Sequence, residues 1–250
     1  RSADAVYADL LTAYRSNVSR TDAVLDVAVG FYEARGGHCY NSALYATLSV
    51  ADSASGGVCG IRHVHRKFFL PTYGVFDEER FVSRGRSIRA FHTRFGRMAM
   101  IICEDAWHSV SGTIAALDGA KIVLVLSASP GREFTGVGIG SLERWDRLLQ
   151  AIAEEHGVFV VYSGLVGFEG GKGFTGSSRV LDPWGRTVIK GPVTEACLVR
   201  AGIETDDLAL ARAATPLLTD LESAFGDVIE LLARVRRNAY ECEHWGDTGE

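Results

Sequence analysis

The sequence predicts one globular domain, residues 1–250, of the α/β or α+β class, with helices outside one or two layers of sheet. Strand-like apolar segments occur both in consecutive runs and in alternation with helical segments, which is the pattern of such folds. The 250 residues are 47 % hydrophobic and 23 % charged, as in an ordinary globular chain. Twenty-eight glycines against five prolines indicate many tight turns, and no internal repeat or linker divides the chain.

The first half of the chain reads as one helix followed by strands. Residues 3–15 are predicted to be helical because Val6, Leu10, Leu11 and Tyr14 fall on one face. A Gly/Ser turn is expected at residues 53–57. The predicted strands are residues 23–30, 42–50, 60–70, a pair within 86–96, and 97–102.

The second half contains the clearest helix, residues 141–156, which places Trp145 and Leu149 on one face and stops at Gly157. A shorter helix is expected at residues 111–119. The predicted strands are residues 122–126, 159–165, 177–181, 186–189 and 196–201. Residues 217–240 form a terminal amphipathic helix whose apolar stripe consists of Leu217, Leu218, Leu221, Phe225, Ile229 and Leu232.

Charge and cysteine content exclude several classes of protein. The formal net charge is −5, and the basic residues are scattered apart from Arg234, Arg236 and Arg237, which disfavours a nucleic-acid partner. No apolar run reaches the roughly 20 residues of a membrane span, and the N-terminus has no signal-peptide core. The five cysteines include no C-x-x-C pair, so neither a disulfide framework nor a zinc site is indicated. A reducing, cytoplasmic location is expected.

Two motifs are too weak to carry a function. Residues 171–176 match the dinucleotide pattern G-x-G-x-x-G, but a strand rather than the required helix is predicted after them. His63 and His65 alternate on one strand without a neighbouring carboxylate or cysteine. We interpret both as surface or packing residues, and we expect no metal site and no cofactor.

The strongest signal is the segment from Met98 to Trp107. An apolar strand ends at Cys103, two carboxylates follow at Glu104 and Asp105, and a helix begins soon after. Backbone N–H groups and the helix dipole favour a thiolate at such a position, and a thiolate can attack a carbonyl or nitrile carbon. The alternative is a small buried apolar residue, which is the role of most lone cysteines.

A second segment places Lys67 at the end of a strand, before a loop that contains Pro71, Asp77 and Glu78. A lysine beside a tetrahedral intermediate can stabilise its oxyanion, and its charge lowers the pKa of a nearby thiol. The alternative for Lys67 is a solvated strand end.

Together these segments resemble the nitrilase, or carbon–nitrogen hydrolase, superfamily. The lysine motif resembles Arg66-Lys67-x-x-Leu70-Pro71, and the cysteine motif resembles Cys103-Glu104-Asp105-x-Trp107. The loop from Leu70 to Glu78 is especially similar to the glutaminase domains of glutamine-dependent NAD synthetases. Further matches occur in order, between about residues 24 and 205. They are Val29-Gly30-Phe31, Tyr40-Asn41-Ser42-Ala43, Ser127-Ala128-Ser129-Pro130, Gly173-Phe174-x-Gly176-x-Ser178 and Asp182-Pro183-x-Gly185.

The resemblance implies a four-layer α-β-β-α sandwich and a Glu–Lys–Cys triad. Cys103 corresponds to the nucleophile that forms a thioester, and Lys67 with the backbone N–H of Glu104 would hold the oxyanion. Glu78 corresponds to an acidic residue that orients the lysine and the substrate. Substrate contacts are implied for Tyr73, Glu104, Trp107, Ser127 and Ser129, with Tyr73 and Trp107 shaping the pocket wall. Glu104 and Asp105 are also expected to hold the turn at Cys103 by hydrogen bonds.

The sequence departs from the family at the triad glutamate. Glu33 is the one glutamate before Lys67, but it follows a strand that the family places after its catalytic glutamate, so a position at the rim is expected. The first strand, the first helix and the general base are therefore expected upstream of Arg1. A polypeptide that truly begins at Arg1 is predicted to be inactive.

The resulting hypothesis is a cofactor-free amidohydrolase that releases ammonia from a small amide, as glutaminases and ω-amidases do. Alternatives are an N-carbamoyl-amino-acid substrate, as in β-ureidopropionases, a nitrile, or a catalytically incomplete binding or assembly subunit. The resemblance also implies a homodimer or higher homo-oligomer. The helix at residues 217–240 could serve as a dimer arm or pack on its own domain.

Overall fold

The computed structural model describes residues 1–51, 59–135 and 138–244. Its helices are α1 (Ala3–Asn17), α2 (Ser109–Leu117), α3 (Gly140–His156), α4 (Asp207–Ala214) and α5 (Leu217–His244), with short 3-10 helices η2 (Glu78–Arg80) and η3 (Cys103–Trp107). Its strands are β1 (Val24–Arg35), β2 (His38–Ser49), β3 (Gly60–Arg66), β4 (Ala90–Thr93), β5 (Gly96–Ile102), β6 (Ile122–Ser127), β7 (Phe134–Thr135), β8 (Gly138–Ile139), β9 (Phe159–Gly164), β10 (Val166–Glu169), β11 (Lys172–Thr175), β12 (Arg179–Leu181) and β13 (Thr187–Lys190).

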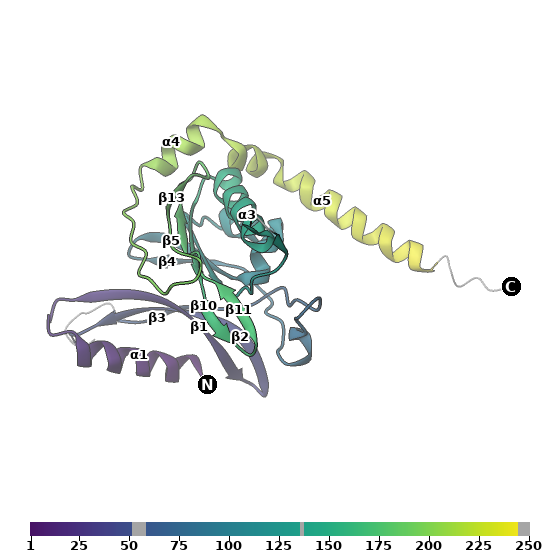
Figure 1. The fold of residues 1–250 in the computed structure, drawn as a ribbon. Helices are drawn as coiled ribbons and strands as arrows, with labels where there is room; N and C mark the ends of the chain where they lie inside the picture. The colour runs from purple at the N-terminus through teal and green to yellow at the C-terminus, as the bar shows by residue number, and fades with distance from the viewer. Residues whose placement is uncertain (52–58, 136–137, 245–250) are drawn as a thin grey trace.

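The strands form two main sheets. The three-stranded sheet has the order β1-β2-β3 and is antiparallel throughout. The six-stranded sheet has the order β13-β12-β9-β6-β5-β4, with parallel pairing of β5, β6 and β9 at its centre. β10 and β11 pair as a separate hairpin, and so do β7 and β8. Figure 1 shows α1 and α3 on opposite sides of the two main sheets.

Side chains that alternate along β2 and β5 divide the core into three clusters. On β2, Leu44 packs toward Val6 of α1, whereas Tyr45 packs toward the six-stranded sheet. On β5, Met100 joins Tyr45 between the two sheets, whereas Ile101 packs toward the helices on the far face. This alternation follows from the two-residue period of a strand, so both β2 and β5 are buried on both faces.

Most predicted elements are confirmed with shifted ends. The helices predicted at 3–15, 111–119, 141–156 and 217–240 correspond to α1, α2, α3 and α5. α3 ends as predicted, because Gly157 adopts the left-handed conformation with φ 55°. The strand expected at 60–70 stops at Arg66, because the backbone N–H groups of Phe68 and Phe69 donate to the Asp105 side chain instead of to a strand.

Several segments differ from prediction. The strand pair expected within residues 86–96 is instead the single strand β4, which pairs with β5. The strand expected at 196–201 is wrong, since these residues have no regular structure and β13 already ends the six-stranded sheet. The helix α4 was not predicted. The G-x-G-x-x-G segment lies in the β10–β11 hairpin and leads into β12, so the helix that a dinucleotide site requires does not follow it. The turn expected at 53–57 lies outside the described residues.

Within the described part of the chain, no helix combines the length and apolar character needed to cross a bilayer. The same residues contain no group of three metal-ligating side chains placed to hold an ion. His65 is buried against Asp105, and the His63 ring stacks on Phe91 at 4.6 Å between centroids, so both histidines are packing residues.

Candidate active site

Cys103 lies at a sharp turn between β5 and η3. The apolar run of β5 ends at Ile102, and the next residue has a φ of 44°, which is in the left-handed region that non-glycine residues rarely adopt. Such strained backbone is concentrated at functional sites and persists only where the surroundings hold it. The turn brings the Cys103 side chain out of the sheet at the carboxyl end of a central parallel strand.

Asp105 holds this turn in place. Its Oδ2 accepts hydrogen bonds from the backbone N–H of Ile102 at 3.0 Å and contacts Nε2 of His65 at 2.8 Å. Its Oδ1 accepts from the backbone N–H groups of Phe68 and Phe69 at 2.9 and 2.8 Å. One buried carboxylate therefore fixes the Cys103 turn to the segment that follows Lys67. The expected structural role of Asp105 is confirmed.

Lys67 is almost completely buried, with 2 % of its surface exposed, and its charge is paired with Glu78. The Nζ atom donates to Oε1 and Oε2 of Glu78 at 2.9 and 2.7 Å. The chain after Lys67 is held by a bond from the Gly85 N–H to the Lys67 carbonyl at 2.7 Å. A Cβ at residue 85 would lie 2.0 Å from the Arg66 carbonyl oxygen, so this close approach requires glycine.

The pKa of the Cys103 thiol is raised, chiefly because the side chain is buried. The positive charge of Lys67 and the hydroxyl of Ser127 act in the opposite direction, whereas Glu104 and Glu78 raise the pKa further. The sequence predicted a lowered pKa from the helix dipole and the lysine. The lysine contribution is present, but burial outweighs it because a thiolate loses its hydration there.

A cavity of about 650 Å³ brings four of the predicted residues together: Cys103, Lys67, Glu78 and Ser127. Its walls come from β1, β2, β5, β6, β9 and β10 and from the segments after β3, β6 and β13, and include Phe31, Phe76, Leu126 and Leu165. The volume suits a small organic ligand. The Ser127 Oγ is buried beside the Cys103 thiol, on which it acts as described above.

The other predicted substrate contacts lie beside this cavity rather than in its lining. The Tyr73 hydroxyl donates to Glu104 at 2.9 Å, and Trp107 packs edge-on against Trp145. Ser129 is buried. Phe76, from the loop after Pro71, is the aromatic residue of this segment that lines the cavity. A contact of Tyr73 or Trp107 with the substrate stays a prediction.

Glu33 does not occupy the rim position that was expected. Its side chain is 3 % exposed, and it forms a two-point ion pair with Arg66, at 2.7 and 2.8 Å. It also accepts a hydrogen bond from Ser42 at 2.9 Å. The strand pairing of β1 with β2 and of β2 with β3 brings these three residues together, and Glu33 is not part of the cavity lining.

Sequence reasoning missed Arg132, which lies on the loop after β6. Its guanidinium carbon is 6.0, 5.4 and 5.8 Å from the ring centroids of Tyr73, Phe76 and Trp107. Its Nε is buried and has no hydrogen-bond partner among the described residues. The faces of the three aromatic rings therefore hold the guanidinium in place by cation–π attraction. No pattern in the sequence around Arg132 indicates that these rings converge on it.

Cys197 was also missed as a cavity residue. It lies in the irregular segment that was predicted as a strand, and it is among the residues that line the same cavity as Cys103. A strand at 196–201 would have hidden alternate side chains in a sheet. The irregular path instead places Ala196 and Cys197 against the cavity.

Comparisons with known proteins agree with this geometry. The family model for carbon-nitrogen hydrolases matches residues 2–213. The chain is 30 % identical over 191 residues to a glutamine-dependent NAD(+) synthetase of Aquifex aeolicus, covering 75 % of this chain and 31 % of that protein. It is 26 % identical over 181 residues to the 2-oxoglutaramate amidase of Bacillus subtilis, covering 72 % of this chain and 64 % of that enzyme.

Among solved structures, the carbon-nitrogen hydrolase of Helicobacter pylori G27 superposes with a TM-score of 0.75 at 22 % identity, covering 90 % of this chain and 76 % of that one. This likeness shows the α/β fold. The chain spans about a third of the Aquifex synthetase that it matches. The family match extends over most of the sequence and includes both the lysine and the cysteine segments, so the chain belongs to the carbon-nitrogen hydrolase family of the nitrilase superfamily.

Proposed function

We propose that the protein hydrolyses the C–N bond of a small amide with Cys103 as the nucleophile. The observation that carries this proposal is the convergence of Cys103, Lys67 and Glu78 on one cavity. A nucleophile at a strained turn, a buried ammonium and a carboxylate that fixes the ammonium are the groups that acyl transfer requires.

The reaction has two halves. The Cys103 sulfur attacks the amide carbon, and the carbonyl oxygen becomes an oxyanion that Lys67 Nζ and the Glu104 N–H stabilise. The C–N bond then breaks, the nitrogen takes up the proton that the Cys103 thiol has given up, and ammonia leaves a thioester on Cys103. Water attacks the thioester carbon, the C–S bond breaks, one proton of the water passes to the sulfur, and the carboxylic acid and the free thiol are released. Glu78 keeps Lys67 aimed at the oxyanion position throughout both halves.

The surroundings of the cavity support an amide that also carries a carboxylate. We assign Arg132 as the cation that binds this carboxylate. The Arg132 guanidinium lies over the Phe76 ring, and Phe76 also lines the cavity. These features fit the ω-amide of an amino acid or oxo acid, the class to which the names of the Aquifex and Bacillus relatives point.

The proposal is tested by measuring ammonia release from glutamine, other ω-amides, N-carbamoyl-β-alanine, neutral amides and nitriles. We expect release from ω-amides, a thioester adduct on Cys103 in the mass spectrum, and loss of both in Cys103→Ala. Cys197→Ala is the matched control, because it removes a second thiol from the same cavity. Ammonia release that survives Cys103→Ala would contradict the assignment of the nucleophile.

The second candidate function is a binding or assembly subunit without turnover. Its support is that, among the described residues, Glu78 is the one carboxylate in contact with Lys67, whereas the resemblance implies a further glutamate as general base. Labelling with a haloacetamide distinguishes the two candidates. Labelling of Cys103 no faster than that of the exposed Cys39, together with no ammonia from any amide, favours the binding subunit.

We also infer that the packing follows the four-layer α-β-β-α order implied by the resemblance. Support comes from the three separate core clusters, which lie between α1 and the first sheet, between the two sheets, and between the second sheet and α2 with α3. Solution scattering tests this order, because a different stacking of the layers would change the dimensions of the molecule and therefore its scattering profile.

A further inference from the structure

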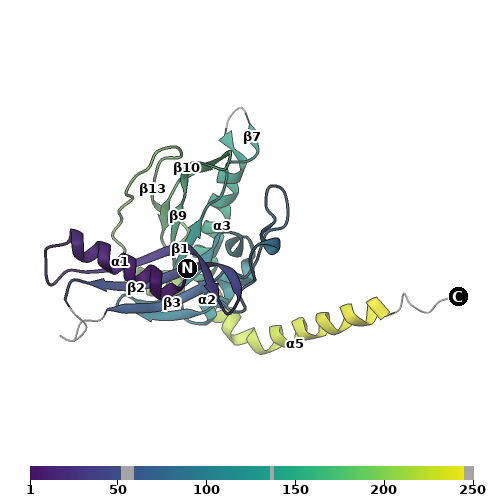
Figure 2. The same ribbon diagram turned by 90° about the horizontal axis from the view of Figure 1, so that it is seen from below.

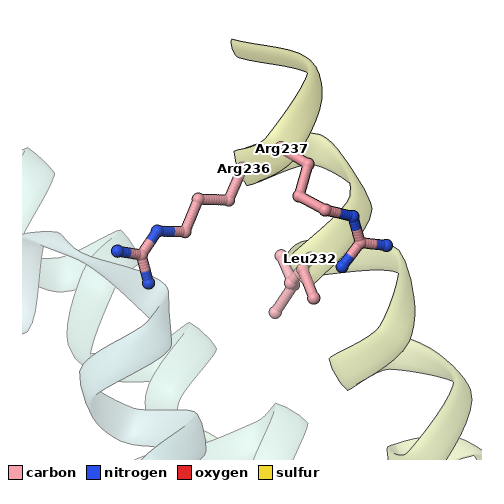
Figure 3. A pocket seen from close by; sticks show the side chains of 4 residues that line it. Leu232, Arg236 and Arg237 are labelled. Carbon is pink, nitrogen blue, oxygen red and sulfur yellow. The ribbon is translucent and has the colours of Figure 1, made fainter. Parts of the chain in front are cut away.

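The helix α5 carries a hollow that lies apart from the cavity. Figures 1 and 2, which are turned by 90° from each other, both show α5 leaving the body of the molecule after its first turns. The hollow is lined by Leu232, Ala233, Arg236 and Arg237, and Figure 3 shows the two arginine side chains extending to either side of Leu232. None of these four residues lines the cavity that contains Cys103. A group that can act on the reaction lies instead in the core, where the two main sheets meet.

His65 is a buried polar side chain that neither half of the proposed reaction uses. It is 1 % exposed, and Asp105, its partner, is 0 % exposed. The Nε2 atom of His65 lies 2.8 Å from Oδ2 of Asp105, whereas Nδ1 has no hydrogen-bond partner among the described residues. Because an ionised carboxylate can only accept hydrogen bonds, we place a proton on Nε2, which donates it to Asp105.

Packing is only part of the role of His65. A buried polar atom without a partner destabilises a fold, and an apolar side chain of similar size would leave no such atom in place of Nδ1. The bond to Asp105 is therefore what a hydrophobic residue could not supply. Among the described residues, Asp105 pairs with no lysine or arginine, so its buried charge depends on His65 and on three backbone N–H groups.

This hydrogen bond lies close to both reactive groups. His65 comes two residues before Lys67, and Asp105 comes two residues after Cys103. His65 is on β3 of the three-stranded sheet, whereas Asp105 is in η3, directly after β5 of the six-stranded sheet. The bond therefore joins the strand end that carries the lysine to the turn that carries the cysteine, across the boundary between the two sheets.

The segment around Lys67 is attached to Asp105 on both sides. His65 makes the attachment before the lysine, and the backbone N–H groups of Phe68 and Phe69 make it afterwards. The backbone N–H of Lys67 itself donates to the Asn41 carbonyl at 2.8 Å, which fixes it within its own sheet only. Without the His65 bond, the lysine segment is held to the Cys103 turn from one side alone.

The relative placement of Lys67 and Cys103 matters for the reaction. The charge of Lys67 is the one that lowers the pKa of the Cys103 thiol against the effect of burial. The same ammonium is assigned to the oxyanion, and donors of this kind act only from a fixed position. A misplacement of about 1 Å in a catalytic group can lower a rate about 100-fold. His65 does not line the cavity, so any effect that it has on the reaction passes through Asp105.

Given the proposed function, on which this step rests, we propose that His65 is a positioning residue whose hydrogen bond to Asp105 holds Lys67 in its working position beside Cys103. Two amide side chains test the bond. Glutamine and asparagine both carry an NH2 donor, but glutamine is one carbon longer and can reach the position of the imidazole Nε2. We expect His65→Asn to lower kcat by about 10- to 100-fold with little change in KM, and His65→Gln to restore most of the loss.

Two further variants separate the hydrogen bond from packing. His65→Leu fills the space without a donor, and it should lower kcat as His65→Asn does while far-UV circular dichroism shows a folded chain. His63→Phe is the matched control, because it replaces the other histidine of the same strand, whose ring stacks on Phe91, and it should leave kcat unchanged. A His65→Gln variant as slow as His65→Asn, or a His65→Leu variant as fast as the wild type, overturns the proposal.

A double-variant cycle tests whether His65 acts on Lys67. Lys67→Met should move the pH profile of Cys103 labelling by a haloacetamide to higher pH, because a positive charge beside the thiol is lost. In the His65→Asn background the same substitution should move the profile less, since Lys67 is no longer held in place. An equal shift in both backgrounds overturns the positioning role. Labelling needs no substrate, so this outcome is distinct from failure of the proposed function, which is ammonia release that survives Cys103→Ala.

Discussion

The buried ammonium of Lys67 contacts both carboxylate oxygens of Glu78, whereas Glu33, the glutamate nearest in sequence before Lys67, pairs with the neighbouring Arg66. Arg66 is the last residue of β3 and Lys67 follows it directly, yet the two cations have different carboxylate partners. Lys67 faces the cavity, and Arg66 holds β1, β2 and the end of β3 together. This division leads to the first prediction.

Glu78→Gln should lower kcat by about 100-fold, because Lys67 loses the anion that fixes its position for oxyanion stabilisation. Glu33→Gln should leave kcat near the wild-type value but lower the melting temperature, since it breaks a buried ion pair. Steady-state kinetics and calorimetry on both variants make the comparison. If the two substitutions lower kcat equally, Glu78 is not the carboxylate that positions Lys67 for catalysis.

Lys67→Met should raise the pKa of the Cys103 thiol, because Lys67 is the positive charge that opposes the effect of burial. At a fixed pH below that pKa, each unit by which the pKa rises lowers the thiolate population tenfold, and haloacetamide labelling of Cys103 slows in proportion. The rate of Cys103 labelling as a function of pH measures this shift. Labelling of the exposed Cys39 serves as the internal control and should not change. An unshifted Cys103 profile would show that Lys67 does not act on the thiol.

Arg132→Leu should raise KM for ω-amides that carry a carboxylate by about tenfold to 100-fold, because a charge-assisted hydrogen bond is lost. The same substitution should change kcat/KM for a neutral amide such as propionamide little, since that substrate has no anion to bind. Arg144→Leu is the matched control, because its partner is the exposed Glu133. Equal losses for charged and neutral amides would mean that Arg132 has only a structural role.

Acid should destabilise the fold through His63, whose pKa is lowered to about 4 by burial and by the nearby His65, Arg89 and Arg66. The unfolded chain takes up this proton near pH 6.5, whereas the folded chain resists it until about pH 4. Unfolding is therefore favoured progressively as the pH falls through that interval. His63→Phe, which keeps the stacking on Phe91, should show a smaller loss of melting temperature over the same range. An identical loss in both proteins would assign the acid sensitivity to other groups.

Most of the elements, and Cys103 and Lys67 as candidate reactive groups, could be predicted from local patterns in the sequence. Continuous apolar runs made β5 and β6 buried central strands, and the three- and four-residue spacing made α3 and α5 amphipathic helices. Cys103 and Lys67 were recognisable because each lies at the end of a strand in an ordered motif. These signals are local, since hydrophobic periodicity and strand ends depend on neighbours along the chain.

Only the tertiary structure decided what surrounds these groups. In the folded chain the Cys103 thiol is buried, which raises its pKa, and Glu33 forms a buried ion pair with Arg66 instead of lying at the rim. Phe76 lines the cavity. The tertiary structure also gathered three aromatic rings around Arg132 and left apolar side chains of α5 such as Leu232 and Val235 exposed. Burial, the pairing of charges and the convergence of rings depend on residues that are distant in sequence and meet only when the sheets pack, so no local pattern records them.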